Sequence, residues 1–217
     1  MQDIIRRVKD PGSAGTHFFG FLAVIPVFIV LMMLSSKEAT KWHMIGFAVF
    51  GISLLLLYGA STIYHTLKVS PEKTRILRKV DHMMIFVLIA GTYTPICLVS
   101  LHGVWGWVLL GLIWSFAILG IFLKLFWMNA PRWFSTLIYV VMGWLAVVAF
   151  VPLKQAVSWK GIALLVAGGL AYTVGAVIYA LKKPNIAFQY FGFHEIFHVF
   201  VLVGSACHIA FMFLYVL

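Results

Sequence analysis

The sequence predicts an all-α integral membrane protein, a single bundle of seven transmembrane helices. Hydrophobic residues make up 63% of the 217 positions and charged residues only 10%, whereas a soluble domain is roughly half apolar and a quarter charged. The length suits about seven spans of roughly 20 apolar residues with short loops, which leaves no room for a second folded domain. The charged residues lie mainly at the ends of the apolar runs. We therefore expect residues 1–217 to form one membrane domain.

The first three predicted spans lie near 14–34, 43–67 and 80–100. The first follows a basic tail that contains Arg6 and Arg7, but no small-residue cleavage site comes after it. We therefore expect an uncleaved span rather than a signal peptide. A Ser-Pro pair at 70–71 ends the second apolar run. The third is expected to begin at Asp81 and its neighbours, after a short charged segment.

The last four predicted spans lie near 104–126, 133–153, 160–181 and 191–215. Turn-forming residues mark their boundaries: a His-Gly pair at 102–103, an Ala-Pro pair at 130–131, and the run Lys182-Lys183-Pro184-Asn185. Lysines stand at the break between the fifth and sixth spans. These breaks predict short loops between antiparallel helices.

The distribution of basic residues predicts the orientation of the bundle. Of the 16 Lys and Arg residues, 12 fall on the side that holds the N-terminus, and the other four are Lys37, Lys41, Lys154 and Lys160. Because basic residues favour the cytoplasmic side, we expect the N-terminus inside and the C-terminus outside. Lipid headgroups also explain the net charge of +10 without a nucleic-acid partner. The expected partners are therefore membrane lipids, with no nucleic acid.

Ionisable residues from three distant spans converge at one predicted depth. His65 ends the second span, Asp81 opens the third, and His194 and His198 open the seventh, one helical turn apart. Ionisable side chains within spans are costly, so they face the bundle interior and usually mark function. A hydrogen-bonded polar network is the structural alternative for such a cluster.

Three imidazoles with a fourth open position form the ligand set of a catalytic zinc. The candidate ligands of one zinc ion are His65, His194 and His198. Asp81 suits a position just outside the ligands, where a carboxylate can act as a base toward water. Ser61, one turn before His65 on the same face, is a candidate to fix an imidazole or a substrate carbonyl.

The motifs Ser61-x-x-x-His65, Asp81 and His194-x-x-x-His198, in this order at span ends, resemble those of the hemolysin III family. That family is the bacterial branch of the progestin and adipoQ receptor family, which includes the adiponectin receptors. The resemblance covers nearly the whole chain.

The resemblance implies a seven-helix bundle in a bacterial plasma membrane, with an intramembrane zinc near the cytoplasmic side. It further implies zinc ligation by His65, His194 and His198, and a site that includes Asp81 and Ser61. The implied chemistry is hydrolysis of a lipid amide, as in ceramidases, in the service of membrane lipid homeostasis.

Other functions stay open on the sequence. The chain is alternatively a non-enzymatic, zinc-stabilised sensor or regulator of lipid composition, or a haemolysin. The His-Glu-x-x-His pattern at 194–198 also resembles that of a zinc protease, with Glu195 as general base. Glu195 lies about 100° around the helix from His194, so we expect it to pair with a Lys or Arg at the interface instead. A retinal protein is excluded, because the last span contains no lysine.

Overall fold

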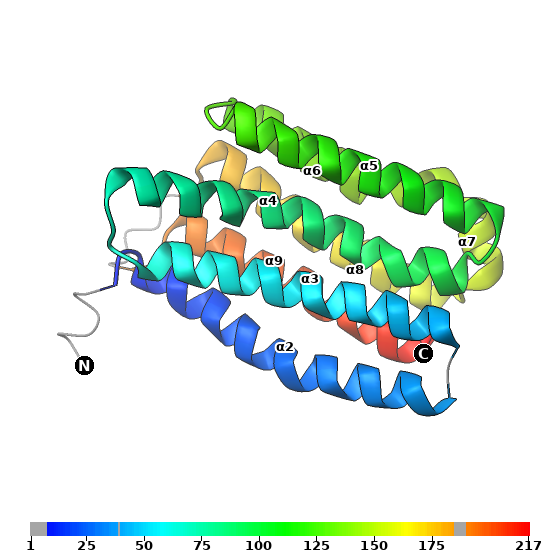
Figure 1. The fold of residues 1–217 in the computed structure, drawn as a ribbon. Helices are drawn as coiled ribbons and strands as arrows, with labels where there is room; N and C mark the ends of the chain where they lie inside the picture. The colour runs from blue at the N-terminus through cyan, green and yellow to red at the C-terminus, as the bar shows by residue number, and fades with distance from the viewer. Residues whose placement is uncertain (1–7, 39, 185–189) are drawn as a thin grey trace.

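The computed structural model describes residues 8–38, 40–184 and 190–217. Arg6, Arg7 and Asn185, which the sequence interpretation used, lie outside the described residues. The described residues are almost entirely helical (Figure 1). The long helices are α2 (Pro11–Glu38), α3 (Lys41–Thr66), α4 (Pro71–Pro95), α5 (Val104–Phe126), α8 (Trp159–Leu181) and α9 (Phe193–Phe211). Two wider, π-helical turns extend α4 and α9, as η1 (Ile96–Ser100) and η3 (Met212–Val216).

Seven helical segments of the described chain are long and apolar enough to cross a membrane. This confirms the predicted all-α, seven-helix architecture of a multi-pass membrane protein, while the orientation in the membrane stays a prediction. The fifth segment is interrupted, because α6 (Arg132–Gly143) passes through the 3₁₀ turn η2 (Leu145–Ala149) before α7 (Phe150–Ala156).

The third helix starts earlier than the sequence interpretation expected. Ser70 caps α4 by accepting a hydrogen bond from the Lys73 N–H, and Pro71 occupies the first turn, where its missing N–H costs nothing. The helix therefore includes the charged segment that was predicted to precede it. Asp81 does not open the span but lies several turns inside α4.

The helices run roughly parallel or antiparallel to one another (Figure 1). Helix α3 packs between α2 and α4, α4 packs on α5, and α9 packs on α8 and α2. Helix α6 packs mainly on α8 and only sparsely on α5, although α5 and α6 are neighbours in the chain. We call the end of the bundle that holds Asp10 and the α3–α4 turn the N-terminal end.

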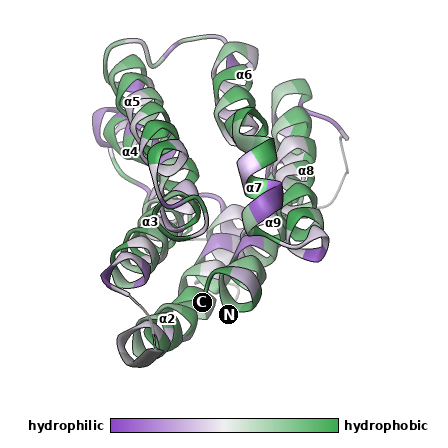
Figure 2. Cartoon of the chain, turned by 90° about the vertical axis from the view of Figure 1, so that its right-hand side faces the viewer, coloured by the Kyte–Doolittle hydropathy of each residue, from purple (hydrophilic) through white to green (hydrophobic). Residues whose placement is uncertain are grey.

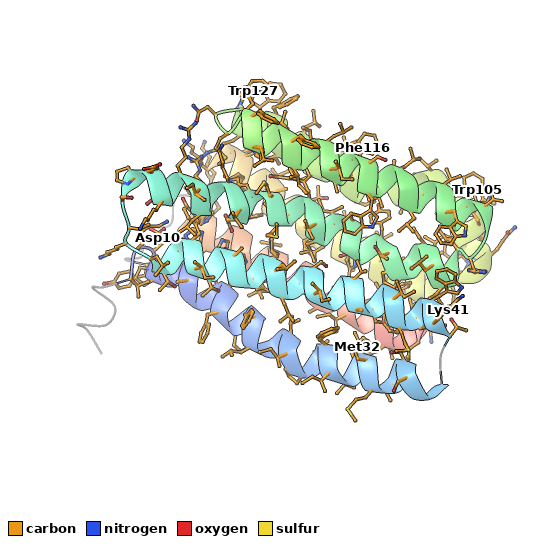
Figure 3. All side chains as sticks on the ribbon, viewed as in Figure 1. Asp10, Met32, Lys41, Trp105, Phe116 and Trp127 are labelled. Carbon is orange, nitrogen blue, oxygen red and sulfur yellow. The ribbon has the colours of Figure 1, made fainter. Side chains whose placement is uncertain are left out.

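Many large apolar side chains are exposed along the helices, as lipid contact requires, and apolar residues predominate along the chain (Figure 2). Trp105 lies at the start of α5, Trp127 directly follows its last residue, and Phe116 lies between them (Figure 3). All three side chains are exposed. Tryptophans at both ends of an apolar span are typical of the two membrane interfaces, so the surface of α5 supports a membrane-spanning position.

Candidate metal centre

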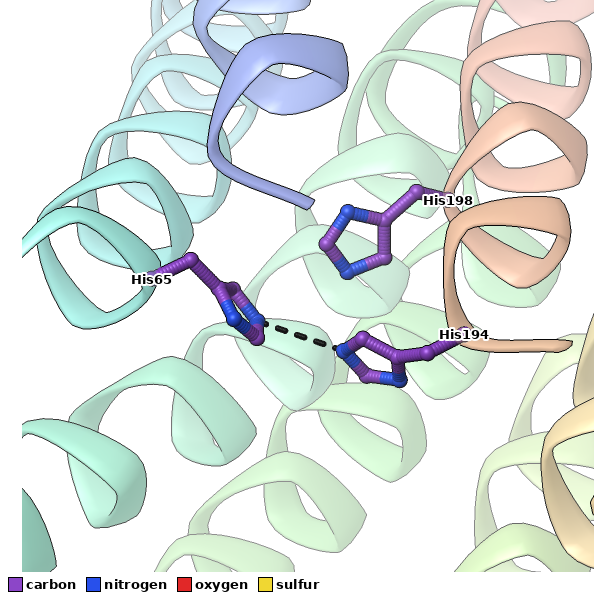
Figure 4. A group of neighbouring side chains, drawn as sticks. All are labelled: His65, His194 and His198. Carbon is purple, nitrogen blue, oxygen red and sulfur yellow. Dashed lines mark hydrogen bonds between the residues drawn. The ribbon is translucent and has the colours of Figure 1, made fainter. Parts of the chain in front are cut away.

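Three histidines from two helices meet at the N-terminal end of the bundle (Figure 4). His65 lies in the last turn of α3, and His194 and His198 lie in the first turns of α9. One ring nitrogen from each lies within 4.8 Å of the others, and the His65 and His194 Nε2 atoms are 3.2 Å apart. Two nitrogens bound to one tetrahedral zinc at about 2.0–2.1 Å each lie about 3.4 Å apart. We call this set the histidine group; it could hold a metal ion, and zinc binding stays a prediction.

Asp10 holds His65 in position. The His65 Nδ1–H donates to the Asp10 carboxylate at 2.9 Å, and the Asp10 N–H donates to the His65 carbonyl at 2.9 Å. Lys9, the residue before Asp10, also contacts the end of α3, because its ammonium donates to the Tyr64 carbonyl at 2.7 Å. With Nδ1 engaged, the Nε2 lone pair of His65 faces the other two histidines, the arrangement in which a carboxylate orients a metal-bound imidazole. The sequence interpretation missed Asp10; the available signal was an acidic residue just before the first span.

His198 is oriented in a comparable way by the start of α2. Its Nδ1 lies 3.2 Å from the Ser13 carbonyl and 3.1 Å from the Thr16 hydroxyl. A proton on Nδ1 donates to that carbonyl, which leaves Nε2 with the lone pair a metal requires. His17 stacks on His198 with ring centroids 3.6 Å apart and planes at 6°. The start of α2 therefore covers the histidine group from one side.

Buried polar atoms without partners border the histidine group. Neither ring nitrogen of His17 nor the Ser61 hydroxyl has a hydrogen-bond partner among the described residues, although their side chains are buried. Buried polar groups are nearly always paired, so orphaned atoms mark a place for a water, an ion or a ligand. Together with the clustered ring nitrogens of the histidine group, these atoms fit a site that takes a metal ion and a further polar group.

Asp81 lies beside the histidine group without joining it. Its carboxylate is 3.4 Å from the His82 Nδ1, and it lines the same cavity as Ser61, His194 and His198. Among the described residues, the group within ligand distance of one another consists of the three histidines. Asp81 is therefore not one of the grouped metal-ligand candidates.

Glu195 faces the start of α2 rather than the basic loops. One carboxylate oxygen accepts the Gly192 N–H at 2.8 Å and the other accepts the Ser13 hydroxyl. In the described part of the chain it makes no ion pair with a Lys or Arg. The expected pairing with a basic residue is not found among the described residues, where Glu195 occupies the third position of α9 and caps its own helix. This engagement also speaks against Glu195 as the general base of a protease.

A cavity of about 140 Å³ extends from the histidine group into the bundle. Its wall is mainly apolar and includes Leu57, Leu88 and Val201. At its far end lies His208, whose buried Nδ1 has no partner among the described residues. The Tyr58 hydroxyl lies in the same region and donates to Ser205 at 2.7 Å. An apolar cavity with polar groups at its ends suits a lipid chain that carries a polar group.

Comparison with known proteins places the chain among membrane proteins of one family. Residues 5–209 match the family model described as Haemolysin-III related. The chain is 41% identical over 198 residues to Hemolysin-3 of Bacillus cereus, covering 91% of this chain and 87% of that protein. It is 42% identical over 199 residues to a Hemolysin-3 homolog of Bacillus subtilis (strain 168), covering 91% and 90%. An adiponectin receptor protein of Drosophila melanogaster is 25% identical over 244 residues, covering 95% of this chain and 50% of the receptor.

Proposed function

The chain belongs to the Haemolysin-III related family, and from this premise we propose that it is a zinc-dependent hydrolase of a membrane lipid amide. Its role would lie in membrane lipid homeostasis, in a bacterial plasma membrane. The observation that carries the proposal is the buried group of three histidines at one end of an apolar cavity.

The chemistry of the donor set supports zinc as the metal. Imidazole nitrogens suit zinc, and three of them leave a fourth position open. A zinc ion held by His65, His194 and His198 would polarise a carbonyl group and make water at the open position more acidic. Asp10 and the Ser13 carbonyl would keep two of the ligand rings in the required orientation.

Asp81 is the proposed proton acceptor. It lines the cavity near His194, and its carboxylate has only the His82 ring within ion-pair distance in the described chain. A carboxylate in this position would take the proton from the water that attacks the lipid carbonyl carbon. The same proton is then available for the amine that leaves when the carbon–nitrogen bond breaks.

Ser61 is the proposed substrate contact. Its hydroxyl is buried, lacks a partner in the described chain and lines the cavity. It would donate a hydrogen bond to the carbonyl oxygen, on which negative charge grows during attack. The apolar wall formed by residues such as Leu57 and Leu88 would hold the acyl chain and exclude water.

The test combines metal analysis with lipid hydrolysis. We expect purified protein to carry about one equivalent of zinc and to hydrolyse ceramide or another N-acyl lipid in a mixed panel. Asp81→Asn should lower the hydrolysis rate by about 100-fold or more, the usual contribution of a general base, without loss of zinc. Glu72→Gln is the matched control, because Glu72 is an exposed acid on the same helix. Hydrolysis by Asp81→Asn at the wild-type rate would remove Asp81 as the base.

A zinc-stabilised regulator without catalytic activity is the second candidate function. It is favoured by one observation: a metal bound by the histidine group would join α3 and α9 directly, and the Ser13 carbonyl of α2 already contacts His198. In that case chelation should lower the unfolding temperature, while wild-type protein hydrolyses no lipid on the panel. Hydrolysis that needs Asp81 would rule this candidate out as the whole function.

A further inference from the structure

The cavity carries a second polar cluster at the N-terminal end of the bundle, formed by cations. Arg78 on α4, Lys124 on α5 and Arg132 on α6 all line the cavity that begins at the histidine group. We call these three residues the cationic cluster. The proposed hydrolysis assigns no role to it.

The residues of the cationic cluster lie close to one another. The Lys124 ammonium donates to the Ser135 hydroxyl at 2.6 Å, and Ser135 lies one turn after Arg132 on α6. Arg78 lines the same cavity as Lys124. The Arg132 guanidinium stands 5.4 Å from the centre of the Tyr179 ring, which lines the same cavity. Three positive charges from three helices therefore border one end of the cavity.

Lys124 is buried without a counter-ion. Only 3% of its surface is exposed, and in the described chain no carboxylate lies within ion-pair distance of Arg78, Lys124 or Arg132. An ammonium has three donors, and the Ser135 hydroxyl uses one of them. A buried charge is costly unless it is paired. Asp81 lines the same cavity, but its carboxylate pairs with the His82 ring instead.

Other lysines near span ends do not behave in this way. Lys41, Lys154 and Lys160 at the opposite end of the bundle are exposed, as expected of long side chains that extend to the interface. Lys41 can be seen there in Figure 3. Lys124 instead lies inside and contacts Ser135. The next residue of α6, Thr136, lines the same cavity, and its buried hydroxyl has no partner among the described residues. A charged donor and an orphaned hydroxyl thus border the same space.

We propose that the cationic cluster binds the anionic headgroup of a lipid, a phosphate or a carboxylate, whose apolar chain enters the cavity. An oxyanion would accept the two unused donors of Lys124 and the Thr136 hydroxyl, and would offset the charges of both arginines. A lipid fits better than a free anion because the cavity wall beyond the cluster is apolar. The proposal rests on the proposed function and deepens it, because it narrows the lipid amide substrates to those with an anionic headgroup.

The test measures binding alone, so that its result does not depend on hydrolysis. Two ether-linked lipids with the same alkyl chain serve as ligands: 1-O-octadecylglycerol 3-phosphate and neutral 1-O-octadecylglycerol. Neither contains an acyl bond. We expect full-length protein in neutral detergent to bind the phosphate lipid at least about 10-fold tighter than the neutral one, the usual range for hydrogen bonds to a charged group.

The matched variants are Lys124→Met and Lys73→Met. Both remove one positive charge from the same end of the bundle, but Lys73 is exposed in the first turn of α4. Lys124→Met should reduce the preference for the phosphate lipid to under about 3-fold, and Lys73→Met should leave it unchanged. If Lys124→Met does not fold, Arg78→Gln replaces it with the same expected direction.

Three outcomes would overturn the proposal. The first is an equal preference in Lys124→Met and Lys73→Met, which would mean a diffuse surface charge effect. The second is equal binding of the phosphate and neutral lipids by wild-type protein. The third is binding of inorganic phosphate as tight as that of the phosphate lipid, which would identify a free anion as the ligand. Failure of lipid hydrolysis would leave this binding result standing, since neither ligand is hydrolysed.

Discussion

The histidine group and the cationic cluster lie at the same end of one cavity but differ in how their nitrogen atoms are supplied with partners. The histidine group is surrounded by acceptors: the Asp10 carboxylate and the Ser13 carbonyl hold the ring protons of His65 and His198. The cationic cluster has donors in excess, and Lys124 has only the Ser135 hydroxyl. The first arrangement prepares lone pairs for a cation, and the second prepares N–H groups for an anion. The two sites therefore differ in the hydrogen-bond acceptors around their nitrogen atoms, and not only in residue type.

The largest expected effect is the loss of zinc binding when one of the three histidine ligands is removed. We expect His198→Ala to weaken zinc binding at least about 100-fold, because one of three ligands is lost from a site worth about 10–16 kcal/mol in zinc-finger peptides. Zinc per chain, measured by mass spectrometry after dialysis against a weak chelator, checks this. His208→Ala is the control, since His208 lies at the far end of the cavity. Full zinc content in His198→Ala would show that the histidine group is a polar network and not a metal site.

The next largest effect on zinc affinity is expected when Asp10, which accepts the ring proton of His65, loses its charge. Asp10→Asn keeps the size of the side chain but removes the charge that orients His65, so zinc affinity should fall about 10- to 100-fold. Competition with a fluorescent chelator measures the affinity. Glu72→Gln, which alters an exposed acid, should leave the affinity unchanged. An unaltered affinity in Asp10→Asn would mean that the contact of Asp10 with His65 plays no part in metal binding.

In the cationic cluster, removal of a charged side chain should stabilise the protein, whereas in the histidine group it should weaken zinc binding. In lipid-free protein, Lys124→Met should raise the free energy of unfolding by about 1–2 kcal/mol, because an unpaired buried ammonium is replaced by an apolar side chain of similar length. Denaturation in neutral detergent, with Lys73→Met as reference, measures the change. A loss of stability would show that the hydrogen bond to Ser135 already compensates the charge.

The smallest effect on catalysis is expected at Glu195. Glu195→Gln keeps the acceptor for the Gly192 N–H, so lipid hydrolysis should stay within about 3-fold of the wild-type rate. The loss of charge at the first turn of α9 should cost about 0.3–1 kcal/mol of stability. Parallel assays of hydrolysis and thermal unfolding separate the two effects. A fall in hydrolysis as large as that of Asp81→Asn would restore the protease-like role of the glutamate.

The sequence by itself determined the number of apolar helices and the depth of the polar residues. The apolar runs set the spans, and the spacing of His194 and His198 sets them on one face of a helix, because both depend only on local periodicity. His65 could be placed at the same depth by its position near the end of an apolar run. These inferences needed no knowledge of which helices are neighbours.

Only the tertiary structure decided which polar groups become partners. Asp10 meets His65 across 55 positions of the chain, and Ser13 meets His198 across 185. The burial of Lys124 and the contact between Glu195 and Ser13 likewise depend on how α2, α5, α6 and α9 pack. In a membrane, lipid and helix surfaces are equally apolar, so hydrophobicity does not reveal which helix faces contact each other. The sequence therefore indicated a metal site, but the residues that orient its ligands and the cationic cluster beside it were decided by the packing.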